Sequence, residues 1–191
     1  MWLERPKHYY HRLEKRFRGA RILDVGCGRS KFPGATGLDV RTNSAADIRT
    51  DLDRLPWPLR EGSFDLIVMR HVLEHMQDVV ATVEELYRIA KPDGRIVVET
   101  PHFSWVEAFR HPGHRHFFAG GSFDYYYPGN PTYRAHLRVR RRRIYFNDLF
   151  KVIGFEAAAN RFSRPYERHL AFIFPAGSIV WELEAVKGPG G

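Results

Sequence analysis

The sequence predicts an α/β fold with a mostly parallel sheet, and two observations carry this prediction. Strand-like apolar runs alternate with helical or turn segments along the first hundred residues. Glycines and acidic residues stand where several of these runs end, and open α/β sheets bind ligands at the carboxyl ends of their strands. A chain of 191 residues is long enough for one domain of this kind with a buried core and a concave site.

The first half of the chain supplies most of the expected elements. A basic, amphipathic pattern over Tyr9–Arg18 predicts a helix that ends before Gly19. The strands expected next are Arg21–Val25, Ala35–Asp39, Ala46–Thr50, Ser63–Met69 and Arg95–Thr100. A helix is expected over Asp78–Ala90 and capped by Lys91–Gly94, whereas the first crossover has room for about one helical turn at Ser30–Phe32.

The second half departs from this regular alternation. Residues 101–136 are rich in His, Phe, Tyr, Gly and Pro, and a long irregular insertion inside a domain is usually functional, so we expect a lid here. The strands expected beyond it are Leu137–Phe146, Phe155–Asn160 and His169–Phe174, with a short helix over Asn147–Ile153. The last segment, Ile179–Val186, fits either a further strand or a helix.

The net charge of +8 is concentrated in one part of the chain. Six of the positive charges come from Arg134, Arg138, Arg140, Arg141, Arg142 and Arg143. Alternating arginines on an edge strand commonly prevent edge-to-edge pairing. The same patch could contact nucleic acid, an anionic membrane surface or an anionic small substrate, and these interpretations stay open.

The compartment is predicted from two features. The first seven residues lead directly into a charged, aromatic segment without an apolar leader, and no stretch reaches the 18 apolar residues of a membrane span. Cys27 is the single cysteine, so no internal disulfide can form. We therefore expect a cytoplasmic protein without a membrane span.

The ends of the first three strands predict an adenosine site. Gly26 and Gly28 follow the first strand, where glycines permit a tight turn and a close approach of the backbone to a ligand. Asp39 ends the second strand, where a carboxylate can accept hydrogen bonds from both hydroxyls of a ribose. Asp51 follows the third strand with Leu52, where a carboxylate and an N–H can meet an adenine edge.

Six blocks in this order resemble the class I S-adenosylmethionine-dependent methyltransferases, particularly their small type 11 branch. The blocks are Leu23–Gly28, Gly37–Asp39, Asp51–Pro56, Gly62–Ile67, His71–His75 and Leu86–Gly94. The resemblance implies a Rossmann-like, seven-stranded, mostly parallel sheet with helices on both faces. It implies one domain over residues 1–191, with a cofactor half over 20–101, a substrate and lid insertion over 101–136, and completion of the sheet over 137–187.

The resemblance also implies S-adenosyl-L-methionine as the cofactor. The contacts that it assigns in this chain are Asp24, Gly26, Cys27, Gly28, Asp39, Val40, Asp51, Leu52, Arg70 and His71. Asp24 would reach the methionine amino group through water, and Ser30 stands where the family often carries a third glycine. A dinucleotide is less suitable, because its pyrophosphate needs a well-formed helix behind the glycine loop.

Candidate catalytic residues follow from the chemistry of methyl transfer. The protein has to position an acceptor and exclude water, and a base helps when the acceptor is a hydroxyl. His102 and His71 stand at the ends of the fifth and fourth strands, and imidazole titrates near neutrality. We expect one of them to act as the base, with packing, cofactor contact or acceptor hydrogen bonding as alternatives.

The insertion is expected to recognise the acceptor. The candidate substrate-binding residues are Phe103, Trp105, Arg110, His111, His114 and Tyr125. The histidines at 111, 114 and 116 have a spacing that suits a metal, but no nearby Asp, Glu or Cys completes a ligand set, so we expect none. The segment also resembles uncharacterised methyltransferases associated with polysaccharide assembly, which favours a sugar-like acceptor.

Three functions stay open. The favoured one is methyl transfer to a small-molecule or saccharide acceptor, at oxygen. The second is an RNA methyltransferase that uses the Arg138–Arg143 patch for phosphate contacts and the aromatic insertion for stacking. Against it, Arg70–Leu73 occupies the place of the Asn-Pro-Pro-Tyr tetrapeptide of many base-methylating enzymes. The third is a non-catalytic S-adenosylmethionine-binding protein.

Overall fold

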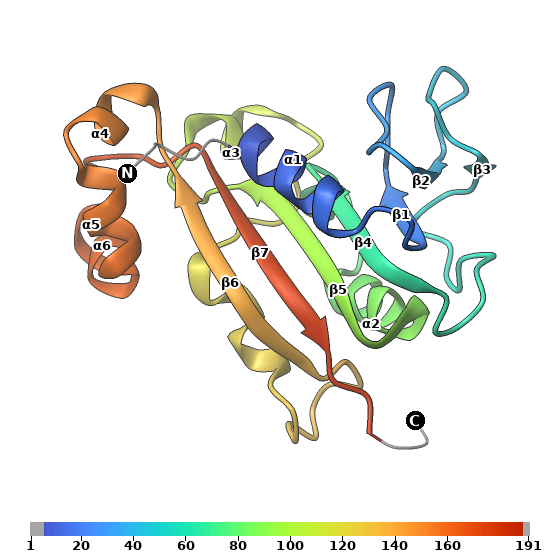
Figure 1. Ribbon diagram of the computed structural model, residues 1–191. Helices are drawn as coiled ribbons and strands as arrows, with labels where there is room; N and C mark the ends of the chain where they lie inside the picture. The colour runs from blue at the N-terminus through green and yellow to red at the C-terminus, as the bar shows by residue number, and fades with distance from the viewer. Residues whose placement is uncertain (1–5, 189–191) are drawn as a thin grey trace.

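The computed structural model describes residues 6–188, which contain a seven-stranded sheet (Figure 1). Its strands are β1 (Ile22–Val25), β2 (Ala35–Asp39), β3 (Ile48–Arg49), β4 (Phe64–Arg70), β5 (Ala90–Pro101), β6 (Leu137–Tyr145) and β7 (Ser178–Ala185). Their order across the sheet is β3-β2-β1-β4-β5-β7-β6. Strands β1 to β5 pair in parallel, and β7 runs antiparallel to both β5 and β6. The expected mostly parallel sheet is confirmed.

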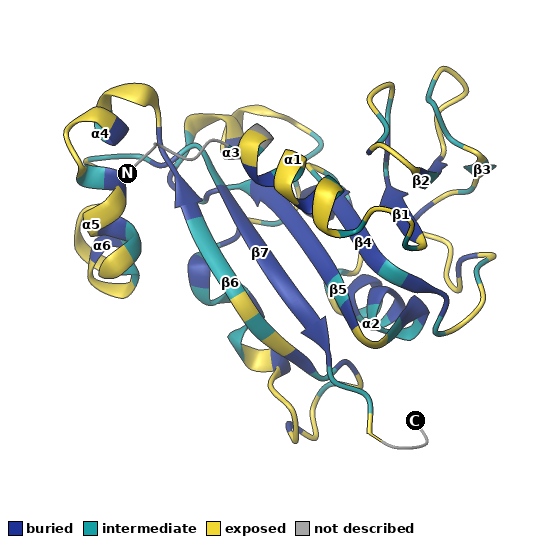
Figure 2. Cartoon of the chain, viewed as in Figure 1, coloured by how far each residue is buried: buried dark blue, intermediate teal, exposed yellow. Residues whose placement is uncertain are grey.

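Helices lie on both faces of this sheet, as expected. They are α1 (Pro6–Arg16), α2 (Val79–Ile89), α3 (Val106–Arg110), α4 (Asp148–Val152), α5 (Phe155–Arg161) and α6 (Ser163–His169), with two 3-10 helices, η1 (Leu73–His75) and η2 (Gly120–Tyr126). Tyr9 and Leu13 of α1 pack on one face, while α2 packs on the other through Val83 and Leu86. Figure 2 shows the consequence: the outward side of α1 is exposed, and β5 and β7 are buried between the layers.

The boundary between α2 and β5 differs from the expectation. Asp78 caps α2 by accepting a hydrogen bond from the Ala81 N–H at 2.9 Å. The helix ends because Ala90 adopts an extended conformation and pairs at once with Phe64 of β4. Lys91–Gly94 is therefore an irregular first part of β5, where the β4–β5 register shifts, rather than a helix cap.

Two strands expected in the last third are wrong. The segment Phe155–Asn160 forms α5, because its run of alanines favours a helix and Asn160 docks that helix on β6. The Asn160 side chain donates to the Ile144 carbonyl and accepts from the Ile144 N–H, both at 2.8 Å. The segment His169–Phe174 ends α6 and continues in turns, where Phe172 stays exposed and pairs with no strand.

The remaining expectations in this region agree with the structure. The last segment takes the strand alternative as β7, which inserts between β5 and β6. The short helix is α4, capped by the Asn147 side chain, and β6 is an edge strand. In the first half of the chain, by contrast, the helical turn expected at Ser30–Phe32 is wrong: the segment has no helix, and the Phe32 N–H donates to the Asp24 carboxylate instead of to a helix carbonyl.

The insertion of residues 101–136 packs partly into the core. Phe118 and Phe123 make edge contacts with Trp181 of β7, and the Trp181 indole donates to the Gly120 carbonyl at 3.0 Å. Within residues 6–188, none of the helices has the length and apolar character needed to cross a membrane. The expectation about a leader concerns in part residues 1–5, which lie outside the described residues.

Candidate active site

Two adjacent hollows lie at the carboxyl ends of β1, β2 and β4. The first, of about 650 Å³, lies between α1 and the loop after β1, and its lining includes Tyr10 and Glu99. The second, of about 420 Å³, lies beside the ends of β2 and β3. The second hollow is lined by Gly26, Asp39, Val40, Arg41, Asp51, Leu52, Asp53, Arg70, His71, Val72, His75, Met76 and His111. Gly26, Arg70 and His71 line both hollows and stand at their junction.

The glycine loop after β1 adopts a conformation that explains its two glycines. Gly26 and Gly28 have φ values of +66° and +53°, which L side chains rarely adopt. A Cβ on Gly26 would lie 2.3 Å from Cγ2 of Val72, whereas a Cβ on Gly28 would meet nothing within 4 Å. Gly26 therefore allows close packing of the loop on the segment after β4, and Gly28 leaves open space above the strand.

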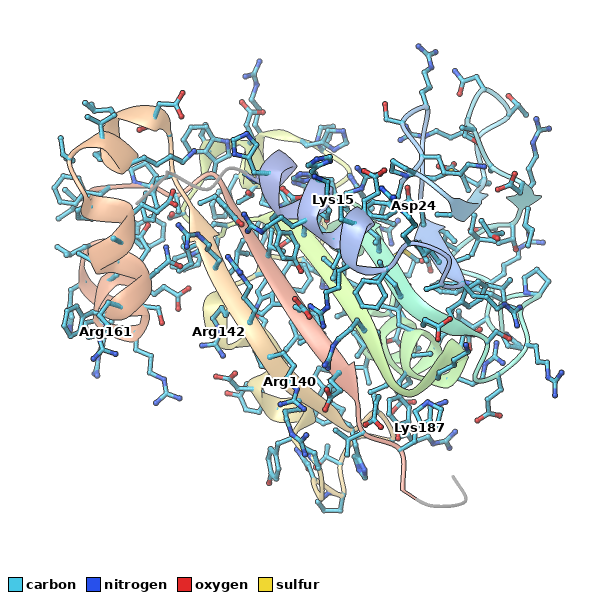
Figure 3. All side chains as sticks on the ribbon, in the orientation of Figure 1. Lys15, Asp24, Arg140, Arg142, Arg161 and Lys187 are labelled. Carbon is cyan, nitrogen blue, oxygen red and sulfur yellow. The ribbon has the colours of Figure 1, made fainter. Side chains whose placement is uncertain are left out.

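Asp24 at the end of β1 holds this loop in place (Figure 3). Its Oδ2 accepts hydrogen bonds from the Phe32 N–H at 2.7 Å and from Nη2 of Arg70 at 2.9 Å. Burial raises the pKa of Asp24, and the Arg70 guanidinium opposes that shift. Its Oδ1 is buried and has no hydrogen-bond partner among the described residues. A ligand ammonium, reached through water, would satisfy this acceptor.

Asp39 and Asp51, at the ends of β2 and β3, differ in their surroundings: Asp39 is buried and hydrogen-bonded, whereas Asp51 is exposed. The Asp39 carboxylate accepts from the N–H groups of Gly28 and Arg41, both at 2.8 Å, which ties the ends of β1 and β2 together. Each of its oxygens retains a second lone pair for a hydroxyl. Asp51 is exposed at the rim, and the Leu52 carbonyl beside it accepts from the Trp57 indole at 3.0 Å.

Comparison with known proteins agrees with this geometry. The model of the methyltransferase-domain family matches residues 3–186. The chain belongs to this family. A crystal structure of an S-adenosylmethionine-dependent methyltransferase from Archaeoglobus fulgidus shares the fold, with a TM-score of 0.65 at 18% identity over 93% of each chain.

Two curated methyltransferases are similar over part of the sequence. A probable S-adenosylmethionine-dependent methyltransferase of Mycolicibacterium smegmatis is 30% identical in an alignment of length 116 that covers 52% of this chain and 45% of that protein. The chloroplastic tocopherol O-methyltransferase of Arabidopsis thaliana is 33% identical in an alignment of length 103 that covers 42% of this chain and 30% of that protein. The chain thus spans less than half the length of these relatives.

The cofactor of this methyltransferase family is S-adenosylmethionine, and the described residues fit it. The open space at Gly28 and the unsatisfied Oδ1 of Asp24 suit the methionine part. The carboxylates of Asp39 and Asp51 suit the ribose hydroxyls and the adenine amine. Of the ten expected contacts, all except the buried Asp24 line one of the two hollows, and Asp24 is linked to them through Arg70.

His71 lies between two buried carboxylates. Its Nδ1 is 3.6 Å from Oε1 of Glu74, and its Nε2 is 3.5 Å from Oε1 of Glu99. Burial alone would lower the pKa of His71, but the two carboxylates raise it to about 10. His71 therefore carries a proton at neutral pH and forms ion pairs with both carboxylates, which differs from the proton-accepting role expected from the sequence.

Glu99 and Tyr10 complete this arrangement, and neither belongs to a motif that could be recognised in the sequence. The Tyr10 hydroxyl of α1 donates to Oε2 of Glu99 at 2.7 Å. Burial would raise the pKa of Glu99, but the charged His71 ring and the hydrogen bond from Tyr10 hold that pKa below its usual value. A carboxylate at this position of β5 is thus kept charged beside His71.

The catalytic expectation for His102 is corrected by its surroundings. The ring is fully buried and lines neither hollow. Its Nδ1 is 2.8 Å from the Ser104 hydroxyl, and its Nε2 is 3.1 Å from Oε1 of Glu167. Both nitrogens are occupied by protein partners, so His102 connects β5 to α6 instead of facing a substrate.

The expected substrate-binding residues do not assemble into one wall. His111 lines the second hollow, and His114 lies beside it. The others line neither hollow: Phe103, Trp105, Arg110 and Tyr125. Arg110 forms an ion pair with Glu107 at 2.9 Å, and Tyr125 is exposed on η2. Only the part of the insertion that follows α3 reaches the cofactor region.

Four arginines of β6, two of which are labelled in Figure 3, are paired with carboxylates. Arg138 and Arg140 contact Glu184 of the neighbouring strand, at 3.0 Å and 2.6 Å. Arg142 pairs with Asp124 of η2, and Arg143 pairs with Glu156 of α5 at 3.0 Å. This surface therefore presents fewer unneutralised charges than the sequence indicates.

Proposed function

We propose that this chain transfers a methyl group from S-adenosylmethionine to an oxygen of a small-molecule or saccharide acceptor. The observation that carries the proposal is the pair of hollows joined at Gly26, Arg70 and His71. The unsatisfied Asp24 and the open glycine loop suit the methionine end, and Asp39 with Asp51 suits the adenosine end. The similarity to a tocopherol O-methyltransferase supports oxygen as the methylated atom.

The residues at the junction have separate roles in this proposal. S-adenosylmethionine, when bound, supplies a methyl group on a sulfonium. Arg70 and Asp24 hold the glycine loop under the methionine end. Protonated His71 directs both ring nitrogens at Glu74 and Glu99, and its positive charge at the junction stabilises the negative charge that develops on the acceptor oxygen as the acceptor proton leaves to solvent. Glu99 and Tyr10 keep the His71 ring in position.

Calorimetry with S-adenosylmethionine tests the cofactor part of the proposal. Asp39→Ala should lower the affinity at least about 10-fold, because it removes the ribose acceptor and a brace of the loop. Asp93→Asn is the matched control, because Asp93 lies at the opposite end of β5 and its φ of 59° suits asparagine. No saturable binding by the unsubstituted chain, or equal affinity in the Asp39 variant, would contradict the proposal.

Acceptor screening separates transfer from mere binding. A set of phenols, alcohols and saccharides should include at least one compound that releases S-adenosylhomocysteine above the rate without acceptor. A chain that binds the cofactor and never exceeds that rate is the non-catalytic alternative. The RNA alternative has less support, because the arginines on which it relies are engaged by carboxylates. The buried, unpaired Cys27 supports a cytoplasmic location within the same proposal.

A further inference from the structure

Three histidines from two distant segments meet at the rim of the second hollow. His75 ends η1, whereas His111 and His114 follow α3. One nitrogen of each ring lies within 4.8 Å of one nitrogen of each of the others. The ring centroids of His75 and His114 are 4.7 Å apart, and those of His111 and His114 are 4.8 Å apart. The segments are joined by the Arg115 N–H, which donates to the Glu74 carbonyl at 2.8 Å.

Hydrogen bonds fix the tautomer of two of these rings. Nδ1 of His75 lies 2.9 Å from the Gly113 carbonyl, and Nδ1 of His114 lies 2.9 Å from the Ala108 carbonyl. A carbonyl only accepts, so both rings donate from Nδ1 and keep a lone pair on Nε2. Metal-binding histidines usually have this arrangement, in which a backbone oxygen orients the ring behind the ligand nitrogen.

His111 is the exposed member of the cluster. Its Nδ1 accepts from the Gly113 N–H at 3.1 Å, so coordination requires a change of tautomer or a rotation of this ring. Tetrahedral zinc has nitrogen ligands at about 2.0–2.1 Å, which places them about 3.4 Å from one another. The three rings would therefore close by about 1 Å around an ion.

Glu74 is a second, independent observation that points to a cation. Its side chain is only 1% exposed, and neither carboxylate oxygen has a hydrogen-bond partner among the described residues. A buried carboxylate without hydrogen bonds is costly unless a positive charge lies close by. Oε1 of Glu74 is 4.0 Å from Nε2 of His114, on the side of the cluster opposite to that ring's Nδ1 hydrogen bond. The protonated His71 ring lies 3.6 Å from the same oxygen and compensates part of this charge, but it leaves Oε2 without a partner among the described residues.

We propose that His75, His111 and His114 bind a divalent transition-metal ion of the zinc type, with Glu74 as the fourth ligand. Imidazole nitrogens suit zinc, cobalt and nickel, whereas magnesium and calcium prefer sites built from oxygen. The sequence argued against a metal because no nearby acidic residue or cysteine completes a ligand set with His111 and His114. The fold supplies the missing ligands from η1, which lies beside the loop through backbone hydrogen bonds.

An ion at this position would affect the second hollow. His75 and His111 line the hollow that also contains Asp39 and Asp51. An ion bound there would join the loop after α3 to η1 and fix one wall of that hollow. Binding of an ion by these residues does not depend on whether the chain transfers a methyl group.

Metal binding by the purified chain without a polyhistidine tag tests the proposal. After treatment with a chelator, calorimetry and elemental analysis with Zn²⁺ should show one ion per chain, and Mg²⁺ should not compete. Co²⁺ in place of Zn²⁺ should give the visible absorption of a four- or five-coordinate site with nitrogen ligands. This spectrum reports on the ligands of the unsubstituted chain and needs no variant. Absence of a saturable ion per chain, or a cobalt spectrum of octahedral water and carboxylate, would overturn the proposal.

Variants then identify the ligands. His75→Ala and His114→Ala should each lower the zinc affinity at least about 100-fold, and Glu74→Gln should lower it about 10-fold. His116→Ala is the matched control, because this histidine lies in the same loop but its Nε2 is bonded to the Met76 carbonyl at 3.0 Å. It should bind zinc like the unsubstituted chain. An equal loss in the His116 variant would show that zinc binds non-specifically to the loop and would refute the site.

Discussion

The guanidinium of Arg140 lies against both carboxylate oxygens of Glu184, with Nε 2.8 Å from Oε2 and Nη2 2.6 Å from Oε1. Glu184 is almost fully buried, and Arg95 of β5 contacts the same carboxylate. One acid on β7 thus links the strands on either side of it. Paired contacts of this geometry are stronger than single exposed ion pairs. The arginines at this edge of the sheet therefore help to hold β6 and β7 against β5.

The first prediction concerns stability in acid. The hydrogen bond from Arg140 lowers the pKa of Glu184 from 4.5 to about 2, although burial opposes this, and Arg95 adds to it. A lowered pKa contributes stability that is complete above the unfolded value and is lost as the pH falls from 4.5 towards about 2. Glu184→Gln should lower the free energy of unfolding at pH 7. It should also make that free energy depend less on pH between 4.5 and about 2. Urea unfolding at several pH values measures it, with Glu107→Gln, an exposed acid, as the control.

The second prediction concerns RNA. Because Arg138 and Arg140 are paired with Glu184, we expect weak RNA binding and a lowered melting temperature when both become serine. Arg164→Ser, at an exposed position on α6, should leave the melting temperature unchanged. Gel shifts at two salt concentrations check the RNA part. A steep salt dependence that disappears in the double variant would favour the RNA alternative over a small-molecule acceptor.

The cofactor half could be predicted from the sequence because its determinants are local. A strand that ends in glycines needs the backbone conformation seen at Gly26, and the strand ends bring Asp39 and Asp51 to one edge of a parallel sheet. Each of these features depends on a few consecutive residues. The general class of the fold follows from them, and so does the position of nearly all of the expected cofactor contacts beside the two hollows.

The parts that could not be predicted depend on contacts between distant segments. The sequence pattern at Phe155–Asn160 predicts a strand, but the segment forms a helix that packs on β6 through Asn160. His102 follows the fifth strand, where a catalytic residue is expected. Its Nε2 is bonded to Glu167, which stands 65 residues later in the chain, so the ring is not available to a substrate. The acidic neighbour of His114 is Glu74, which no spacing rule within the loop could indicate.

The third prediction tests the packing of the glycine loop. Gly26→Ala adds a Cβ that would lie 2.3 Å from Val72 at a φ of +66°, so the loop has to shift away from the segment after β4. Strain of about 1–3 kcal/mol at such a position corresponds to a loss of about 5- to 150-fold in affinity for S-adenosylmethionine. Gly62→Ala has a similar φ of +58° with nothing within 4 Å, and it should keep the affinity. Equal affinities in the two variants would mean that the Val72 contact is not important for the cofactor.

The fourth prediction concerns His71. His71→Asn removes the positive charge at the junction of the two hollows, so turnover should fall about 100-fold if this charge stabilises the acceptor oxygen. Cofactor affinity should change much less, because Gly26, Asp39 and Asp51 are untouched. Steady-state kinetics with calorimetry separates the two effects. A fall in cofactor affinity as large as the fall in turnover would assign His71 to cofactor binding alone.

The fifth prediction tests whether the insertion is attached to the sheet as the structure indicates. Trp181 is fully buried in β7, contacts Phe123 with a centroid distance of 5.0 Å, and donates to the Gly120 carbonyl. Trp181→Ala should lower the free energy of unfolding by about 3–5 kcal/mol, because it leaves a cavity between the sheet and η2. Phe172→Ala, at an exposed aromatic position, should change it by less than about 0.5 kcal/mol. Urea unfolding measures both. A small loss at Trp181 would mean that residues 117–126 contribute little to the core, and hydrogen exchange should then be fast across η2.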